Sequence, residues 1–238
     1  MDAVAQVWHR AWATQAPPPA EVMVVTAALA LLLVLYRPAW GLSRHVVTIV
    51  HEAAHGVVAL LAGRRLAGIR LHSDTSGLTV SRGKPRGTGM ILTFVAGYPG
   101  PALFGLAAAA VLGSGHAVGL LWGLLAGLAL LLLQIRNWFG LCSVLGTGSA
   151  VFAVSWWLDE RWQSACAYLI TWFLLFAAPR PVLELQSKRR GGGARDSDAD
   201  WLARLTGLPG LVWVGLFAVL AFAALAVGGY WLTAPYRR

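Results

Sequence analysis

Runs of about 20 mostly apolar residues recur along this chain of 238 residues. Such a run can cross a bilayer as a helix, because a helix pairs its own backbone N–H and C=O groups where water is absent. Hydrophobic residues form 58% of the chain and charged residues only 12%, against about 25% charged residues in an ordinary soluble domain. The sequence therefore predicts an all-α integral membrane protein, a polytopic helical bundle of about six to seven transmembrane helices. The apolar segments are 21–36, 44–63, 89–112, 117–134, 138–158, 162–178 and 209–233.

The basic residues indicate how the chain is oriented. With the N-terminus placed inside, 14 of the 19 Lys and Arg residues fall on the cytoplasmic side, in residues 1–20, 64–88 and 180–208 and at Arg136. Because positive residues accumulate in cytoplasmic loops, we predict a multi-pass protein of the bacterial plasma membrane with a cytoplasmic N-terminus. The net charge of +9 is then explained by topology and by contact with the lipid bilayer, which argues against a nucleic-acid partner.

The domain organisation follows from the same pattern. Residues 1–20, which end in three consecutive prolines, are predicted to be a flexible cytoplasmic lead. Residues 21–238 are predicted to form a single membrane domain, interrupted by a polar stretch at 64–88 and a basic cytoplasmic loop at 180–208. The two cysteines, Cys142 and Cys166, lie in apolar segments and form no disulfide framework.

A His-Glu-Ala-Ala-His motif lies inside the apolar segment 44–63. On a helix, His51 and His55 share one face and can bind one zinc ion, and Glu52 is then placed to act as the general base on an attacking water. Ionisable residues at this depth are costly and are therefore candidates for function. The alternative is a pair of histidines that pack between helices and are satisfied by neighbouring backbone and hydroxyl groups.

Residues 64–88 have the pattern of a β-hairpin after the motif helix. Residues 69–72 and 78–82 alternate apolar and polar side chains around a turn rich in Ser, Asp and Gly. A free strand edge beside a metal site could pair with an extended peptide substrate; an ordinary cytoplasmic loop is the other interpretation. Asp74 is expected to cap the turn, and His72 is expected to be exposed.

Three further polar features each allow two interpretations. The Gly- and Pro-rich residues 96–101 could shape a water-filled pocket or serve helix packing alone. Asn137 could bind a substrate backbone through its amide or simply begin a helix. The Asp-Ser-Asp run at 196–198 is expected to cap an amphipathic helix, although an Asp there could instead fold back onto a metal.

Three stretches of the chain carry a resemblance to a known family: the motif residues 48–56, the strand-turn-strand pattern at 68–81 and the cluster at 96–101. They resemble the site-2 protease family of intramembrane zinc metallopeptidases, in its bacterial M50B-like branch. The resemblance covers residues 44–112, and residues 136–146 are similar to a degenerate third core helix of that family. It implies a zinc cofactor, a membrane-protein or peptide substrate cleaved in or near a transmembrane segment, and a part in regulated intramembrane proteolysis.

The family's third core helix carries a Leu-Asp-Gly motif whose Asp completes the zinc site, and this chain has no Asp there. The corresponding residues 144–148 read Val-Leu-Gly-Thr-Gly. Catalytic zinc normally has three protein ligands, so a third ligand must come from elsewhere in the chain. The candidates are Asp198, Asp200, Asp74, His72 and Asn137.

We therefore predict a membrane-embedded zinc metallopeptidase of the site-2 protease type, with Glu52 as the catalytic residue, His51 and His55 as metal ligands and Asn137 as a substrate-binding residue. A catalytically inactive pseudoprotease that binds membrane-protein partners through the same hairpin and pocket is the alternative. A transporter is disfavoured, because the sequence lacks the internal repeat and the paired acidic residues typical of that class.

Overall fold

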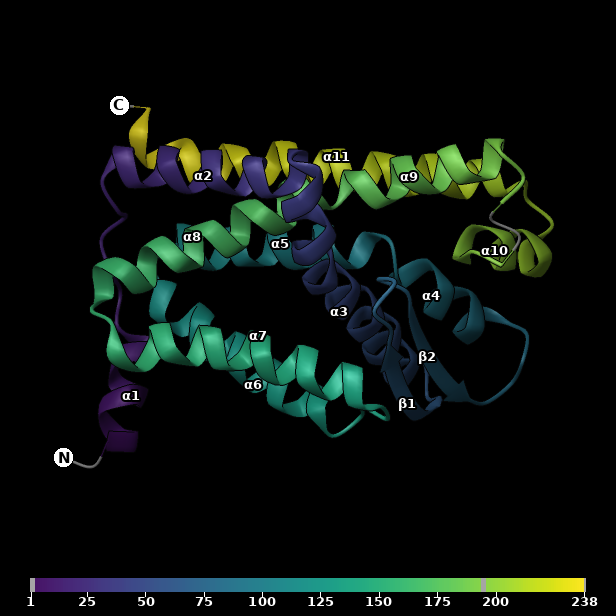
Figure 1. Ribbon diagram of the computed structural model, residues 1–238, viewed down its shortest axis with the longest axis horizontal. Helices are drawn as coiled ribbons and strands as arrows, with labels where there is room; N and C mark the ends of the chain where they lie inside the picture. Colours follow the sequence, from purple (N-terminus) through teal and green to yellow (C-terminus); the bar gives the residue numbers. More distant parts are fainter. Residues whose placement is uncertain (1–2, 194–195, 238) are drawn as a thin grey trace.

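The computed structural model describes residues 3–193 and 196–237, and these form an elongated, mostly helical structure with one small β-sheet (Figure 1). The fold class predicted from the sequence is confirmed in these terms. In chain order the elements are α1 (Ala3–Trp12), α2 (Ala20–Leu35), α3 (Arg37–Leu61), β1 (Arg65–Leu71), β2 (Gly77–Arg82), α4 (Thr88–Ala96), α5 (Pro99–Gly113), α6 (Ala117–Leu132), α7 (Trp138–Trp157), α8 (Glu160–Ala177), α9 (Pro179–Arg190), α10 (Asp198–Thr206), α11 (Gly210–Thr233) and a 3-10 turn, Ala234–Tyr236.

Between three and five segments are long and apolar enough to cross a membrane. Three helical stretches meet this condition alone, Trp138–Trp157, Glu160–Arg190 and Gly210–Tyr236. Two further pairs meet it only when joined, α2 with α3 across a bend of 99° and α4 with α5 across a bend of 68°. The predicted count of six to seven transmembrane helices is not confirmed. Pro38 at the start of α3 and Pro99 at the start of α5 lie at these bends, where proline cannot continue the preceding helix.

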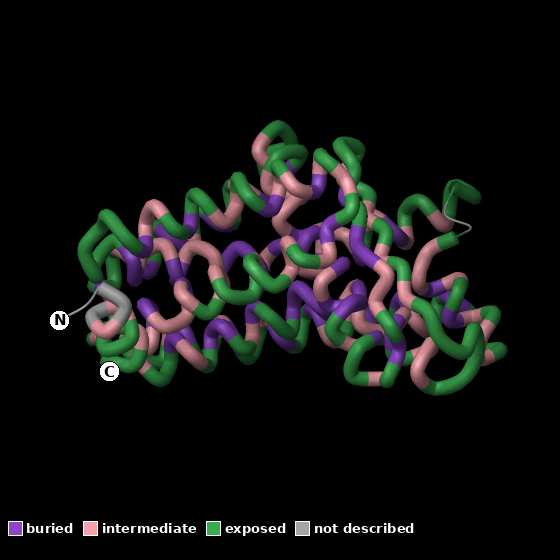
Figure 2. The backbone as a smooth tube through the Cα atoms, turned by 90° about the horizontal axis from the view of Figure 1, so that it is seen from below, coloured by how far each residue is buried: buried purple, intermediate pink, exposed green. Residues whose placement is uncertain are grey.

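Helix α1 lies at one end of the long axis, and the β-hairpin lies toward the other end, which is formed by α10 and the neighbouring loops (Figure 1). Both termini lie at the end of α1 (Figures 1 and 2). The segments 21–36 and 44–63 are expected to cross the membrane twice, whereas α2 runs from the α1 end to the middle of the molecule and α3 continues from there to the hairpin, across the bend of 99° (Figure 1). This arrangement does not support an N-terminus on the same side as the hairpin. The described part of residues 1–20 contains helix α1, and its expected flexibility stays a prediction.

The main core lies where α2, α5, α8 and α11 pack together. Small residues allow this close approach: Ala102 and Ala109 are fully buried, and Gly105 and Gly228 both face the side chain of Leu175. The buried residues follow the inward faces of the helices, and the exposed ones face outward (Figure 2). Helices α3 and α4 pack against α5 of this bundle, and α10 packs against α11.

The predicted hairpin is confirmed as an antiparallel β1–β2 pair, in which Leu71 faces Gly77 and Ile69 faces Thr79. The second edge of β1 is also occupied, because the backbone of Ile69 exchanges hydrogen bonds with residues 134 and 136 at 2.7 and 2.9 Å. Ile69, Leu71 and Val144 are buried together beneath the sheet. Within the described residues, the edge of β2 is therefore the one that remains free.

Candidate metal centre

Helix α3 presents His51 and His55 on one face, one helical turn apart, as their spacing predicts. Their Nε2 atoms lie 3.1 Å apart, and their rings are nearly perpendicular, with 85° between the planes. His55 is buried and His51 is half-buried at the wall of an open cavity. The two imidazoles therefore face the interior of the protein and converge on a common space.

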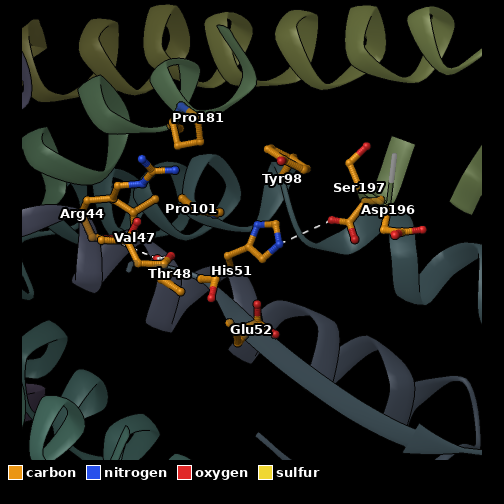
Figure 3. Close-up of a pocket in the computed structure, with 15 residues that line it drawn as sticks. Arg44, Val47, Thr48, His51, Glu52, Tyr98, Pro101, Pro181, Asp196 and Ser197 are labelled. Carbon is orange, nitrogen blue, oxygen red and sulfur yellow. Dashed lines mark hydrogen bonds and ion pairs between the residues drawn. The ribbon is translucent and has the colours of Figure 1, made fainter. Parts of the chain in front are cut away.

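Asp198, the first residue of α10, supplies a third group to this space. Its Oδ2 atom lies 3.4 Å from Nε2 of His51 and 3.3 Å from Nε2 of His55. In a tetrahedral zinc site with bonds of about 2.0–2.1 Å, neighbouring ligand atoms are about 3.3–3.4 Å apart. The three separations thus fit one face of a zinc tetrahedron and leave the fourth position open. Figure 3 shows the His51 ring directed from α3 toward the carboxylate at the start of α10.

The hydrogen bond that His55 makes through Nδ1 fixes its tautomer, so that the lone pair of Nε2 faces Oδ2 of Asp198. Its Nδ1 atom lies 2.6 Å from the carbonyl oxygen of Thr93, and because a carbonyl only accepts, Nδ1 carries the proton. Nε2 of a neutral His55 then offers a lone pair to Oδ2 of Asp198, a buried atom that accepts no hydrogen bond from any described residue. Two imidazoles and a carboxylate are a donor set that zinc prefers, so the residues present fit that ion.

Gly97 keeps the space between the ligand atoms open. It follows α4, inside the Gly- and Pro-rich cluster 96–101. A Cβ atom on Gly97 would lie 2.6 Å from Oδ2 of Asp198 and would also collide with Nε2 of His55. Its φ of −59° suits any residue, so glycine is required here for room and not for conformation. The cluster therefore shapes the pocket, which was one of its two predicted roles.

Asp198 can face the histidines because its neighbours form the helix cap. The Ser197 side chain and the N3 residue Asp200 form a reciprocal capping box at the start of α10. Burial alone would raise the pKa of Asp200, but hydrogen bonds from Ser197 and Arg189 outweigh it and lower that pKa. The cap predicted for the Asp-Ser-Asp run is thus present, and Asp198 takes the alternative orientation toward the histidines.

Apolar contacts hold α10 in this position. Ala199 and Leu202 are fully buried against α9 and α11, together with Val182, Val214 and Phe217. On the other side, Trp201 stacks on Phe94 of α4, with 5.7 Å between the ring centroids and 5° between the planes. The amphipathic pattern after residue 198 therefore docks the helix, and docking brings its first residue to the centre.

Glu52 lies next to His51 on α3 and faces the same cavity, which measures about 240 Å³ (Figure 3). The Glu52 side chain accepts a hydrogen bond of 2.6 Å from the Thr79 hydroxyl of β2. Residues 75–77, which lead into β2, also line the cavity. The carboxylate is thus held in place by the hairpin, and a ligand in the cavity would lie between the metal-binding groups and the start of β2.

The opposite wall of the cavity is fixed by charged groups. Arg44 lies about two helical turns before His51 on α3, and it forms an ion pair of 2.9 Å with Glu184 of α9. Glu184 also accepts a 3.1 Å hydrogen bond from the Trp40 indole, and the Arg180 guanidinium lies 4.4 Å from the centre of a Trp40 ring. These contacts tie α9, which precedes the Asp198 segment, to the first half of α3.

The remaining candidate ligands lie elsewhere. His72 is exposed, and Asp74 caps the hairpin turn, where hydrogen bonds from the Ser76 hydroxyl and amide hold the pKa of Asp74 below its usual value. Both groups behave as the sequence predicts for a turn. Asp200 is engaged with Ser197 and Arg189. Among the described residues, none of these three joins the histidine cluster.

Asn137 begins α7 and binds backbone, but that backbone belongs to this chain. Its Oδ1 accepts a hydrogen bond of 3.2 Å from the Leu71 amide, and its Nδ2 donates one of 2.6 Å to the Leu71 carbonyl. Its predicted role in substrate binding stays a prediction. The residues 144–148 lie on α7, where Val144 is fully buried in the apolar cluster under the sheet. Leu145 and Gly146, which follow it, are exposed, so of this stretch it is Val144 that serves packing.

A model of Peptidase M50B-like proteins matches residues 24–228. The chain belongs to this family. M50 peptidases are zinc enzymes, and this M50B-like chain brings together a His-His-Asp group of the kind that binds zinc. The family and the apolar helices indicate an integral membrane protein. Searches of curated proteins and of solved structures gave no significant match.

Nothing in the local sequence around residue 198 marks it as a ligand rather than a cap. The spacing of His51 and His55 is sufficient to find two of the three groups, because both lie on one helix. Asp198 comes from a helix distant in sequence. The signal for it in the sequence is that Ser197 and Asp200 are sufficient to cap α10, which leaves the carboxylate of Asp198 available for another role. That signal becomes decisive only after the fold has placed α10 next to α3 and α4.

Proposed function

We propose that this M50B-like chain is a membrane-embedded zinc metallopeptidase of the site-2 protease type, which hydrolyses peptide bonds in or near transmembrane segments. The observation that carries the proposal is the convergence of His51, His55 and Asp198 beside Glu52 in an open cavity. A bound zinc ion would polarise the scissile carbonyl and make water a usable nucleophile near neutral pH.

Glu52 would act as the general base in this mechanism. It is not one of the three convergent groups, yet it lines the same cavity and is adjacent to His51. Glu52 would take a proton from the attacking water and deliver it to the departing amine. The Thr79 hydroxyl, bonded to Glu52 Oε2, would hold one carboxylate oxygen and leave the other for the proton.

The free edge of β2 would bind the substrate in extended form. A transmembrane helix must unwind before a carbonyl can be attacked, and an edge strand satisfies the exposed backbone by strand addition. Because β1 is already paired on both sides, this role falls to β2, whose first residues border the cavity. A substrate strand on β2 would run past Glu52.

We further propose that the hairpin end faces the cytoplasm. Of the 19 Lys and Arg residues, 12 lie in residues 64–86, at 136, on α9 and at 204, in segments that extend toward that end (Figure 1). The positive-inside rule then places both termini on the opposite side and releases the cleaved fragment into the cytoplasm, as in regulated intramembrane proteolysis.

The Glu52→Gln variant tests the proposal. Purified wild type and variant are placed in proteoliposomes with single-span reporter proteins, zinc content is measured by elemental analysis, and products are identified by mass spectrometry. We expect a loss of cleavage of about 10²- to 10⁴-fold in the variant, with the zinc content unchanged. Reporter cleavage that persists in Glu52→Gln would refute the general-base role. Reporters that bind both proteins equally and are cleaved by neither would favour the pseudoprotease.

A further inference from the structure

A second cavity lies at the other end of the molecule and takes no part in the proposed catalysis. It measures about 200 Å³ and is bordered by α1, α6, α7 and α8, with Arg10, Trp122, Ser155, Trp156 and Gln163 among its lining residues. These helices meet at the end that carries the N-terminus (Figure 1), far from α10 and the hairpin. The cavity is open to the outside.

Gln163 leaves a buried acceptor atom without a partner in this region. The residue is only 2% exposed. Its Nε2 donates to the backbone carbonyls of Ser155 and Leu158, at 3.0 and 2.8 Å. These two carbonyls fix the orientation of the amide, because a flipped amide would turn its oxygen toward two acceptors. Oε1 accepts no hydrogen bond from any described residue and has almost no accessible surface. Because Gln163 lines the cavity, a donor bound there can satisfy Oε1 after a small shift of the lining side chains.

Arg10 adds a positive charge at the same cavity. It lies on α1 and is exposed, and no carboxylate within residues 3–193 and 196–237 forms an ion pair with it. The nearby carboxylate of Asp159 caps α8 by accepting hydrogen bonds from the amides of Arg161 and Trp162. An anionic group can therefore bind Arg10 at the mouth while a donor reaches Gln163 inside.

The surroundings of this cavity have the composition of a membrane interface. Five exposed tryptophans lie on α1, at the end of α7 and at the start of α8, namely Trp8, Trp12, Trp156, Trp157 and Trp162. Tryptophan collects at the level of lipid headgroups, because its ring is apolar and its N–H is polar. Helix α1 runs across the bundle end rather than along the bundle (Figure 1), as an interfacial helix does.

We propose that this cavity binds the headgroup of a membrane glycerophospholipid, one that carries both a phosphate and a hydrogen-bond donor. The phosphate lies at Arg10, and a hydroxyl or ammonium group of the headgroup donates to Oε1 of Gln163. Trp122 and Trp156 cover the apolar part of the headgroup region. Phosphatidylglycerol and phosphatidylethanolamine have this chemistry, whereas phosphatidylcholine has the phosphate but no donor.

Native mass spectrometry of the full chain tests the site. The protein is reconstituted in nanodiscs that contain equal amounts of phosphatidylglycerol, phosphatidylethanolamine and phosphatidylcholine, and the lipids retained after release are counted. We expect retention of a lipid with a headgroup donor over phosphatidylcholine. Arg10→Gln is expected to reduce retention about fivefold, the factor that about 1 kcal/mol per surface charge corresponds to. The matched control is Arg161→Gln, which removes an exposed charge at the same end but outside the cavity lining and should change nothing.

A second variant separates the two contacts. Gln163→Met keeps the side-chain length but removes the acceptor, so the preference over phosphatidylcholine should vanish while binding through the phosphate persists. Equal retention of all three lipids by the wild type, or equal losses in Arg10→Gln and Arg161→Gln, would overturn the proposal. Displacement of the lipid by millimolar glycerophosphoglycerol or inorganic phosphate would overturn the lipid as the source and assign the site to a soluble phosphate.

Discussion

The two cavities at opposite ends of this protein are similar in size, about 240 and 200 Å³, and each adjoins a buried side-chain oxygen without a hydrogen bond. Their neighbours differ. Oδ2 of Asp198 faces two imidazole nitrogens, whereas Oε1 of Gln163 lies near tryptophan rings and one exposed arginine. An anion surrounded by lone pairs requires a cation, and a neutral amide oxygen requires a hydrogen-bond donor. At these two cavities the unpaired atom suggests that a ligand binds, and its neighbours suggest the chemical class of that ligand.

Replacement of Asp198 should have the largest effect on ligand binding at the first cavity and no effect on ligand binding at the second. Asp198→Ala leaves two imidazoles, and zinc affinity should fall by more than about 100-fold, since loss of residues that merely support a ligand already costs 10- to 100-fold. Zinc is measured by competition with a chelator, and lipid retention at the Gln163 cavity should be unchanged. The exposed Asp196, two residues earlier, provides the control Asp196→Ala. A zinc affinity that is the same in both variants would exclude Asp198 as a ligand.

Gly97→Ala tests whether the space at the first cavity is reserved for an ion. The added methyl group would lie between His55 and Asp198, so zinc content and cleavage should both fall, by at least about tenfold. Gly113→Ala on α5 is the control, because nothing lies within 4 Å of its added Cβ. Full zinc occupancy in Gly97→Ala would show that the ligand atoms converge somewhere other than in this space.

Thr79→Val tests how the hairpin supports Glu52, the proposed general base. The substitution keeps the shape but removes the donor to Glu52, so cleavage should fall about tenfold, the value of one hydrogen bond to a charged group, while zinc stays bound. Thr79→Ser restores a hydroxyl and should recover most of the activity. If zinc is lost together with activity, Thr79 supports the fold of the centre and not Glu52 in particular.

Arg189→Gln should give the smallest effect. Arg189 pairs with Asp200 and so helps to hold the start of α10, but both side chains are partly exposed, and such pairs contribute about 0.2–1 kcal/mol. A two- to fivefold loss of zinc affinity is expected, with Arg190→Gln as the control on the same helix. A loss as large as that of Asp198→Ala would mean that α10 detaches without this pair.

The parts of the fold that depend on local pattern were predictable. The motif helix, the hairpin and the helix cap after residue 196 each follow from a few neighbouring residues. The count of six to seven spans is not confirmed, because 21–36 and 44–63 are each apolar and nothing in their composition fixes the bend of 99° between α2 and α3. The expected side of the N-terminus depended on that count and is likewise not supported.

The third ligand marks the limit of reasoning from local sequence. Asp198 was one of five candidates, and the pattern around it favoured a cap. The cap is made by Ser197 and Asp200, so the carboxylate of Asp198 is free to face the histidines. Whether it reaches them depends on how α10 docks against α4 and α11. Asn137 was read correctly as a group that can bind backbone, but the backbone that it contacts is that of Leu71.

The distance in sequence between the histidines and Asp198 has a consequence for biosynthesis. A ribosome completes the helix of His51 and His55 long before it reaches α10, and during that interval the growing chain holds Glu52 beside only two of the three converging groups. The centre is complete once α10 has been made and has docked on α4. Under the proposed function, newly made protein would be unable to cut neighbouring chains in the membrane until its own folding is nearly finished.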